Sequence, residues 1–143
     1  MSAPLLIVRV AGDRIAVPAD RVHSVIELER IIPAPRAPGY IAGLTTLRSR
    51  TLTVIDTARA LGLPGADRTE FALVVESDGC GYALIVDEVE NVASGETLPC
   101  RPEVKLADGW KRVAQGLVET DAGSLLVVDL DTIIAGPQIN QAA

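Results

Sequence analysis

The sequence LLIVRVAGDRIAVPADRVHSV at Leu5–Val25 decides the fold, because a later stretch of the chain repeats its pattern. That later stretch is ALVVESDGCGYALIVDEVENV at Ala72–Val92. Each reads as an apolar strand, a turn with glycine, a second strand and an acidic residue that leads into V-x-x-V. At a constant offset of 67, the aligned pairs include Val8 with Val75, Gly12 with Gly79, Asp20 with Asp87 and Val25 with Val92. This self-similarity predicts an internal duplication built from strands.

The remaining parts of the two halves also match each other. Tyr40–Leu61 contains G-L…L-T-V-I-D, and Arg112–Ile134 contains G-L…L-L-V-V-D, now at an offset of 73. The larger offset predicts an insertion in the second half, which we place within Ala93–Lys111. Short helices are expected at Thr57–Leu61 and Leu130–Ile134, because each begins beside an aspartate whose carboxylate can accept a free backbone N–H.

Several short strands at regular spacing, with turn signals between them, favour a sandwich or a barrel. A repeat of about 65 residues with four or five strands can close as a small barrel, which leaves few sheet edges unpaired. We therefore predict an all-β fold of two small five-stranded, SH3-like barrels related by internal duplication, with one or two short helices. Residues 1–143 form a single domain, with one barrel at about 5–66 and the other at about 67–135. Strand exchange between the barrels stays open.

Composition and charge limit the classes of function. Hydrophobic residues make up 48% of the chain and aromatic residues only 3%, so the core is expected to consist of Val, Ile, Leu and Ala. The net charge of -6 argues against nucleic acid and anionic lipid as partners, because both require a clustered positive field. No apolar run is long enough to insert into a bilayer, and residues 1–4 lack the features of a signal peptide. We expect a cytoplasmic protein.

Candidate catalytic groups lack partners in the sequence. Asp56, Asp87 and Asp129 follow strands, where aspartate commonly caps a turn or a helix. His23 belongs to no recognisable acid–base motif, and Cys80 occupies a hairpin tip without a neighbouring cation to lower its pKa. One histidine and two cysteines at these spacings do not assemble a metal site. We predict neither an enzyme nor a cofactor, and a small β-barrel enzyme is the least favoured alternative.

The segment LTTLRSR at Leu44–Arg50 is the most informative candidate for binding. It lies between two apolar strands, and a hairpin turn accounts for its threonines and serine. A turn does not require Leu47, however, and Arg48 with Arg50 creates a positive spot on an acidic protein. The segment is either a solvated hairpin tip or a contact loop that directs Arg48 at a carboxylate or carbonyl of a partner. Trp110 leaves two interpretations open, a partner anchor or a cover over the inserted loop.

A series of short motifs resembles one known family in its order along the chain. The motifs are Ile15-Ala16-Val17-Pro18, Val22-x-x-Val25, Pro35-x-x-Pro38-Gly39-Tyr40-Ile41-x-Gly43, Leu47-Arg48, Val54-Ile55-Asp56, Leu61-Gly62 and Val86-Asp87-x-Val89. This order resembles CheW, the adaptor of bacterial chemotaxis arrays, and the CheW-like regulatory domain of the chemotaxis kinase CheA. The resemblance covers about residues 5–134.

What the resemblance implies is a non-enzymatic scaffold that couples the histidine kinase CheA to the helical cytoplasmic tips of chemoreceptors. One barrel face would pair with the regulatory domain of the kinase, and a groove between the barrels would take the receptor helix. The protein would associate with membrane-bound receptor arrays only through these partners. The partner-binding residues implied are Arg48, Leu47, Thr46, Gly43, Val22, Ser24, Val25 and Val89.

The sequence departs from the family pattern at this implied contact surface. The family hairpin reads Asn-Leu-Arg-Gly, whereas this chain has Thr46-Leu47-Arg48-Ser49. If position 49 takes a positive φ, serine costs about 1 kcal/mol there relative to glycine. Ser24 stands where many relatives carry glutamate. These departures support an alternative function, a divergent CheW-like module that serves another signalling pathway or partner.

Overall fold

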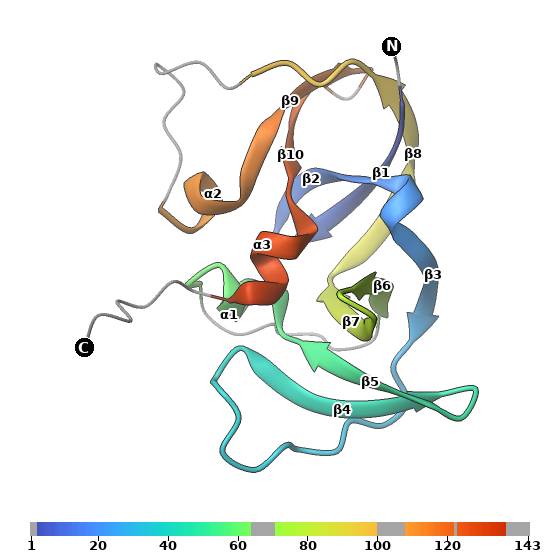
Figure 1. Cartoon of the computed structure of the whole chain (residues 1–143). Helices are drawn as coiled ribbons and strands as arrows, with labels where there is room; N and C mark the ends of the chain where they lie inside the picture. Colours follow the sequence, from blue (N-terminus) through green and yellow to red (C-terminus); the bar gives the residue numbers. More distant parts are fainter. Residues whose placement is uncertain (1–2, 64–70, 100–107, 122, 137–143) are drawn as a thin grey trace.

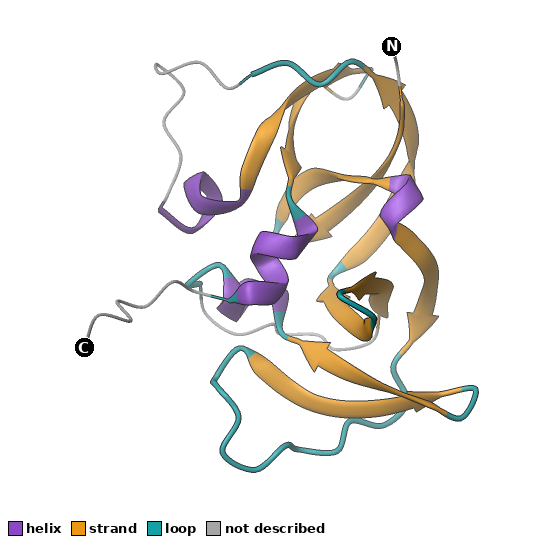
Figure 2. Ribbon diagram, in the orientation of Figure 1, coloured by secondary structure: helices purple, strands orange, loops and turns teal. Residues whose placement is uncertain are grey.

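The chain folds into ten β-strands and a few short helices in the computed structural model, which describes residues 3–63, 71–99, 108–121 and 123–136. Strands dominate both ends of the molecule, and the short helices gather at its middle (Figures 1 and 2). In chain order the elements are β1 Ala3–Val10, β2 Asp13–Pro18, η1 Ala19–Arg21, β3 Val22–Glu27, β4 Ile41–Leu47, β5 Arg50–Ile55, α1 Thr57–Ala60, β6 Phe71–Ser77, β7 Cys80–Val86, β8 Glu88–Gly95, α2 Asp108–Val113, β9 Ala114–Thr120, β10 Gly123–Val128 and α3 Leu130–Ala135.

The strands form two five-stranded sheets, which confirms the predicted fold class. Sheet A has the order β8-β1-β2-β10-β9, and sheet B has the order β3-β6-β7-β5-β4. The orders become identical when each strand is replaced by its equivalent in the other half of the chain. Each sheet takes two strands from one half and three from the other, so the sheets do not follow a boundary near residue 66.

In each sheet an isolated backbone bridge links the segment that follows one edge strand to the other edge strand, which closes the sheet into a barrel. In sheet B, Ile32 follows β3 and exchanges two hydrogen bonds of 2.8 Å with Leu44 of β4. In sheet A, Leu98 follows β8 and exchanges two bonds of 2.7 Å with Leu117 of β9. The neighbouring residues Gly43 and Gly116 make this approach possible. A Cβ atom would lie 2.3 Å from the carbonyl oxygen of Ile32 at Gly43, and 2.5 Å from that of Leu98 at Gly116.

The two predicted helices are present and begin at equivalent aspartates. The side chain of Asp56 accepts a hydrogen bond of 3.2 Å from the backbone N–H of Arg59 in α1. The side chain of Asp129 accepts one of 3.0 Å from the backbone N–H of Asp131 in α3. The sequence did not predict helix α2, which lies at the end of the inserted segment. Gly109 in α2 packs so closely against the end of α1 that a Cβ there would clash with the carbonyl of Leu61.

A central core joins the two barrels. Strand β1 shows how alternation divides its side chains, since Leu6, Val8 and Val10 enter the central core while Leu5 and Ile7 fill sheet A. The equivalent strand β6 likewise sends Leu73 and Val75 into the central core. Trp110 belongs to this core and is only 8% exposed. The buried indole is therefore part of the core and is not available for contact with a partner.

Candidate functional site

The β4–β5 hairpin presents Arg48 at its tip. Arg48 and Ser49 form the turn with φ values of 51° and 67°, the left-handed conformation that both central residues of a type I′ turn adopt. Position 49 therefore has the positive φ that favours glycine in the family pattern. The described residues provide no hydrogen bond or ion pair to the guanidinium of Arg48. The Arg48 side chain is left available for an external group.

A pocket of about 350 Å³ lies beside this hairpin, and we call it the Arg48 pocket. Strands β3, β5 and β6 supply its walls together with the hairpin. Leu52 and Val74 are the buried apolar residues of its lining that share one core cluster, whereas His23, Arg48 and Arg50 are exposed. The lining residues are His23, Ser24, Leu47, Arg48, Arg50, Leu52, Val74, Val75 and Glu76.

Glu76 is the one carboxylate among the lining residues of the Arg48 pocket. Its two oxygens lie 3.7 Å from His23 Nε2 and 3.6 Å from Arg50 Nη2. Both distances exceed those of charge-assisted hydrogen bonds, which are about 2.7–2.9 Å. His23 is the extra residue of a β-bulge, since Val22 and Ser24 pair with the consecutive residues Val75 and Val74. The bulge turns an imidazole toward a rim that already carries two arginines.

A second depression adjoins the Arg48 pocket and lies between β3 and β4. This β3–β4 groove has a volume of about 690 Å³. The hydroxyl of Thr45 donates a hydrogen bond of 2.8 Å to the carbonyl of Arg30 across it. Ile32, which is 54% exposed, adds apolar surface. The groove is lined by Ile26, Glu27, Glu29, Arg30, Ile32, Thr45, Thr46 and Leu47.

The predicted binding residues separate into three places. Ser24, Leu47 and Arg48 line the Arg48 pocket, and Thr46 and Leu47 line the β3–β4 groove. Val25 is 43% exposed on β3, close to both depressions in sequence.

Three further predicted residues lie elsewhere. Val22 and Val89 are half-buried equivalents at the starts of β3 and β8, and both pack against the central core. Gly43 faces the Ile32 carbonyl at the point of barrel closure. Sequence reasoning missed Glu76, because only the pairing of β3 with β6 brings it to the site. Arg50 carried a signal, because the sequence places it with Arg48 as a positive spot on an acidic protein, whereas nothing in the sequence linked His23 to that spot.

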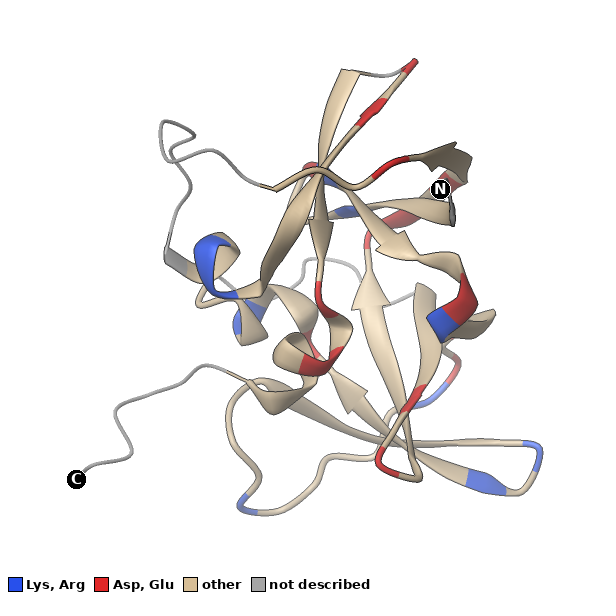
Figure 3. Ribbon diagram, turned by 45° about the horizontal axis from the view of Figure 1, so that its top comes forward, with Lys and Arg blue, Asp and Glu red and all other residues tan. Residues whose placement is uncertain are grey.

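The other barrel carries an equivalent pocket of opposite charge. It has a volume of about 440 Å³ and lies between β8 and β9, with Glu119 and Asp121 at its rim. Asp121 is the counterpart of Arg48, and Figure 3 shows acidic colouring at this hairpin and basic colouring at the β4–β5 hairpin. The lining residues are Ile7, Asn91, Val92, Ala93, Ser94, Glu119, Thr120 and Asp121.

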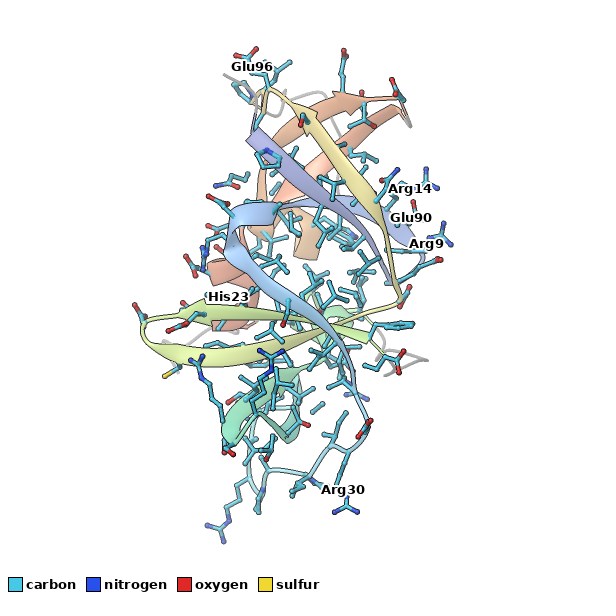
Figure 4. All side chains as sticks on the ribbon, turned by 90° about the vertical axis from the view of Figure 1, so that its right-hand side faces the viewer. Arg9, Arg14, His23, Arg30, Glu90 and Glu96 are labelled. Atoms are coloured by element: carbon cyan, nitrogen blue, oxygen red, sulfur yellow. The ribbon has the colours of Figure 1, made fainter. Side chains whose placement is uncertain are left out.

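The ion pairs beside the two pockets also have opposite polarity. Glu90 is the extra residue of the bulge in β8 and the counterpart of His23. It accepts a hydrogen bond of 2.7 Å from Arg9 Nη2 and forms an ion pair with Arg14 Nε at 2.7 Å, and Figure 4 shows these three side chains together. Arg9 is the counterpart of Glu76. The Glu90 carboxylate on sheet A therefore has two close arginine partners, whereas the Glu76 carboxylate on sheet B has only longer contacts with Arg50 and His23.

Two arginines tie the barrels together away from the pockets. Arg21 in η1 donates to both oxygens of Asp131 in α3, at 2.8 and 3.2 Å, and Ser77 adds a bond of 2.9 Å. The hydrogen bond from Arg21, followed by that from Ser77, lowers the pKa of Asp131. Arg112 donates to the carbonyls of Ala60 and Thr132, at 2.6 and 3.0 Å, and its pKa is lowered chiefly by burial. These contacts fix the helices at the junction of the barrels.

Within the described ranges, no group of three His, Cys, Asp or Glu side chains is arranged to hold a metal ion. A separate search of the same ranges finds no helix with the length and apolar character needed to cross a membrane.

Comparison with known proteins identifies one family consistently. The "Chemotaxis protein CheW" of Thermotoga maritima is 26% identical over 121 residues, which cover 84% of this chain and 80% of that protein. The "Chemotaxis protein CheW" of Rhizobium meliloti is 26% identical over 104 residues, covering 71% and 67% of the two chains. The crystal structure of the scaffolding protein TtCheW from Thermoanaerobacter tengcongensis matches with a TM-score of 0.80 and 24% identity, over 98% of this chain and 90% of that one. The family model of the CheW-like domain matches residues 4–138, and the chain therefore belongs to the CheW-like family.

Proposed function

We propose that this chain couples the histidine kinase CheA to the cytoplasmic helical tips of chemoreceptors. The coarser statement, a non-enzymatic scaffold of chemotaxis signalling, follows from membership of the CheW-like family. Its named partners remain part of the proposal, as does its place at receptor arrays in the cytoplasm.

The observation that carries the proposal is the hairpin of Leu47 and Arg48 beside a hollow surface. Arg48 has no partner among the described residues and shares its pocket with the buried apolar residues Leu52 and Val74. An arginine of this kind contributes to binding by pairing with a carboxylate or carbonyl that the partner supplies. Because strands hold the pocket walls in place, little ordering cost opposes docking of a folded domain such as the regulatory domain of CheA.

Apolar residues on β3 and β8 support the receptor part of the proposal. Val22 and Val89 pack against the central core from half-buried positions at the starts of β3 and β8. Their neighbours Val25 and Val92 are 43% and 62% exposed. Apolar side chains in such an arrangement suit the apolar face of an amphipathic helix.

The direct test replaces Arg48 and its counterpart in the other barrel. We expect Arg48→Ala to weaken binding of the CheA regulatory domain at least tenfold, as loss of a charged hydrogen bond does, while the melting temperature stays within about 1 °C. Asp121→Ala is the matched control, because it removes a charge from the equivalent hairpin tip. Calorimetric titration measures both affinities. Unfolding of Arg48→Ala would make Arg48 structural, and failure of the wild type to bind kinase or receptor tip at tens of micromolar would end the proposal.

A second candidate is a CheW-like module that binds a different partner. Ser24 favours it, since this residue lines the Arg48 pocket at the place where many relatives carry glutamate. The pocket thus lacks one negative charge that the usual partner would meet. Competition between the CheA regulatory domain and other candidate domains separates the two functions, and chemotaxis genes beside this one would favour the first.

A further inference from the structure

We infer that the Arg48 pocket binds a carboxylate side chain of a protein partner, and that Glu76 is an internal carboxylate that competes with it. The inference deepens the proposed function and rests on it for the identity of the partner. The pocket itself is defined by residues of this chain alone. Its chemistry is therefore testable without any partner protein.

The spacing of the charges shows that Glu76 makes no close contact with the basic side chains of the Arg48 pocket. Glu76 lies 3.6 Å from Arg50 and 3.7 Å from His23. On the other barrel Glu90, the counterpart of His23, forms ion pairs with two arginines at 2.7 Å each. An incoming carboxylate can approach Arg48 and Arg50 at the shorter distance, because the Arg48 guanidinium has no partner among the described residues and Glu76 holds Arg50 loosely.

The shape of the donors favours a carboxylate. Two guanidinium groups present flat, paired N–H donors, which match the two oxygens of a carboxylate. The hydroxyl of Ser24 lies in the same lining and can donate to a bound oxygen. Leu52 and Val74 give the lining an apolar part that suits the methylene stem of a glutamate or aspartate. Glu76 repels the same ligand through its negative charge, and this repulsion lowers the affinity of the pocket for a carboxylate.

The experiment follows the side-chain Nε–Hε signals of the pocket arginines by NMR while a blocked triglutamate peptide is added. We expect Arg48 and Arg50 to shift together, with a dissociation constant in the millimolar range. Glu76→Gln removes the competing charge and should tighten binding about fivefold at low salt, with a smaller gain at high salt. Glu96→Gln is the matched control, because it makes the same charge change at a remote position (Figure 4) and should alter the affinity little. Arg48→Ala should remove the response of Arg50.

Equal affinities of the wild type and Glu76→Gln for the peptide would overturn the inference, as would an Arg50 response that persists in Arg48→Ala. Tighter binding of inorganic phosphate than of the peptide would overturn the assignment to a carboxylate. Glu76→Ala repeats the test if the glutamine side chain makes new hydrogen bonds in the pocket. If the peptide binds as expected but the CheA regulatory domain does not bind, the proposed partner is wrong and the carboxylate site stands.

Discussion

The two barrels share their backbone design and differ in the charge at their exposed rims. Sheets A and B have the same strand order after exchange of equivalent strands, and each closes through one bridge next to a glycine. The equivalent hairpin tips nevertheless carry Arg48 in one barrel and Asp121 in the other. Closure depends on close backbone approach and tolerates little change, whereas a solvated rim position is free to diverge. Duplication has thus produced one scaffold with two chemically distinct surfaces.

Substitution of the glycines beside the two closing bridges should have the largest effect on the backbone design that the barrels share. Gly43→Ala and Gly116→Ala each place a Cβ against a backbone carbonyl, at 2.3 and 2.5 Å. We expect each to cost more than about 3 kcal/mol of unfolding free energy, measured by urea denaturation. Gly43→Ala should cost more, because Gly43 also has a φ of 153°. Gly39→Ala, where a Cβ meets nothing within 4 Å, should be nearly neutral. Unchanged stability of either variant would show that the bridge beside the substituted glycine is not needed to keep that barrel closed.

The insertion in the second half removes the symmetry, and Trp110 is the residue from its described part that enters the central core. Trp110→Ala should lower the unfolding free energy by about 3 kcal/mol, because it empties part of the central core. Trp110→Phe should recover most of that loss by keeping an aromatic ring there. Calorimetric melting of both variants checks the difference. A normal melting temperature combined with weakened binding of the CheA regulatory domain would instead make Trp110 a partner anchor.

The ion pair between Arg21 and Asp131 has no equivalent at helix α1, because the residue of α1 that corresponds to Asp131 is Ala58. Arg21 lowers the pKa of Asp131, so the ionised carboxylate stabilises the fold above the ordinary aspartate pKa of about 3.9, and this contribution disappears as pH falls through the lower folded pKa. Asp131→Asn should therefore cost less than about 1 kcal/mol at pH 7, since the pair is partly exposed. Denaturation at several pH values should show the gap in unfolding free energy to the wild type closing as the pH falls below the ordinary aspartate pKa of about 3.9. A gap that persists in acid would contradict the ionic explanation.

The smallest expected effect concerns the turn that displays Arg48. Ser49 has a φ of 67°, which glycine adopts without the steric cost of a side chain. Ser49→Gly should raise the unfolding free energy by about 0.5 kcal/mol, after allowance for the greater freedom of glycine in the unfolded chain. Thermal denaturation followed by circular dichroism measures the change. A destabilised Ser49→Gly protein would mean that the serine hydroxyl makes a compensating contact in the turn.

Local rules predicted much of the fold. Alternating apolar residues identified the strands, repetition identified the equivalences, and Asp56 and Asp129 marked the two helix starts that they cap. The exchange of strands between sheets could not be derived, because both halves carry the same strand patterns and local sequence does not distinguish the two possible partners of β3. Helix α2 was missed since its six residues contain a glycine and lie in a segment that has no counterpart in the first half.

The candidate site was predicted in part for similar reasons. Leu47 and Arg48 stood out because a hairpin tip does not require them, and both line the Arg48 pocket. Glu76 did not, because it reaches the pocket only through pairing between strands that are distant in sequence. Residues predicted as one binding set, such as Gly43 and Arg48, proved to occupy separate places, since order in a family motif carries no information about proximity in space.

The interleaved sheets have a consequence for the order in which the protein folds during synthesis. All strands of sheet B lie between Val22 and Val86, so this sheet can be completed while the rest of the chain is still being made. Sheet A needs β1 and β2 together with β8, β9 and β10, which follow sheet B along the chain. The face of the β1–β2 hairpin that carries Leu5, Ile7 and Ala16 must therefore stay uncovered until those three strands emerge. An uncovered apolar face of this kind exposes a growing chain to aggregation.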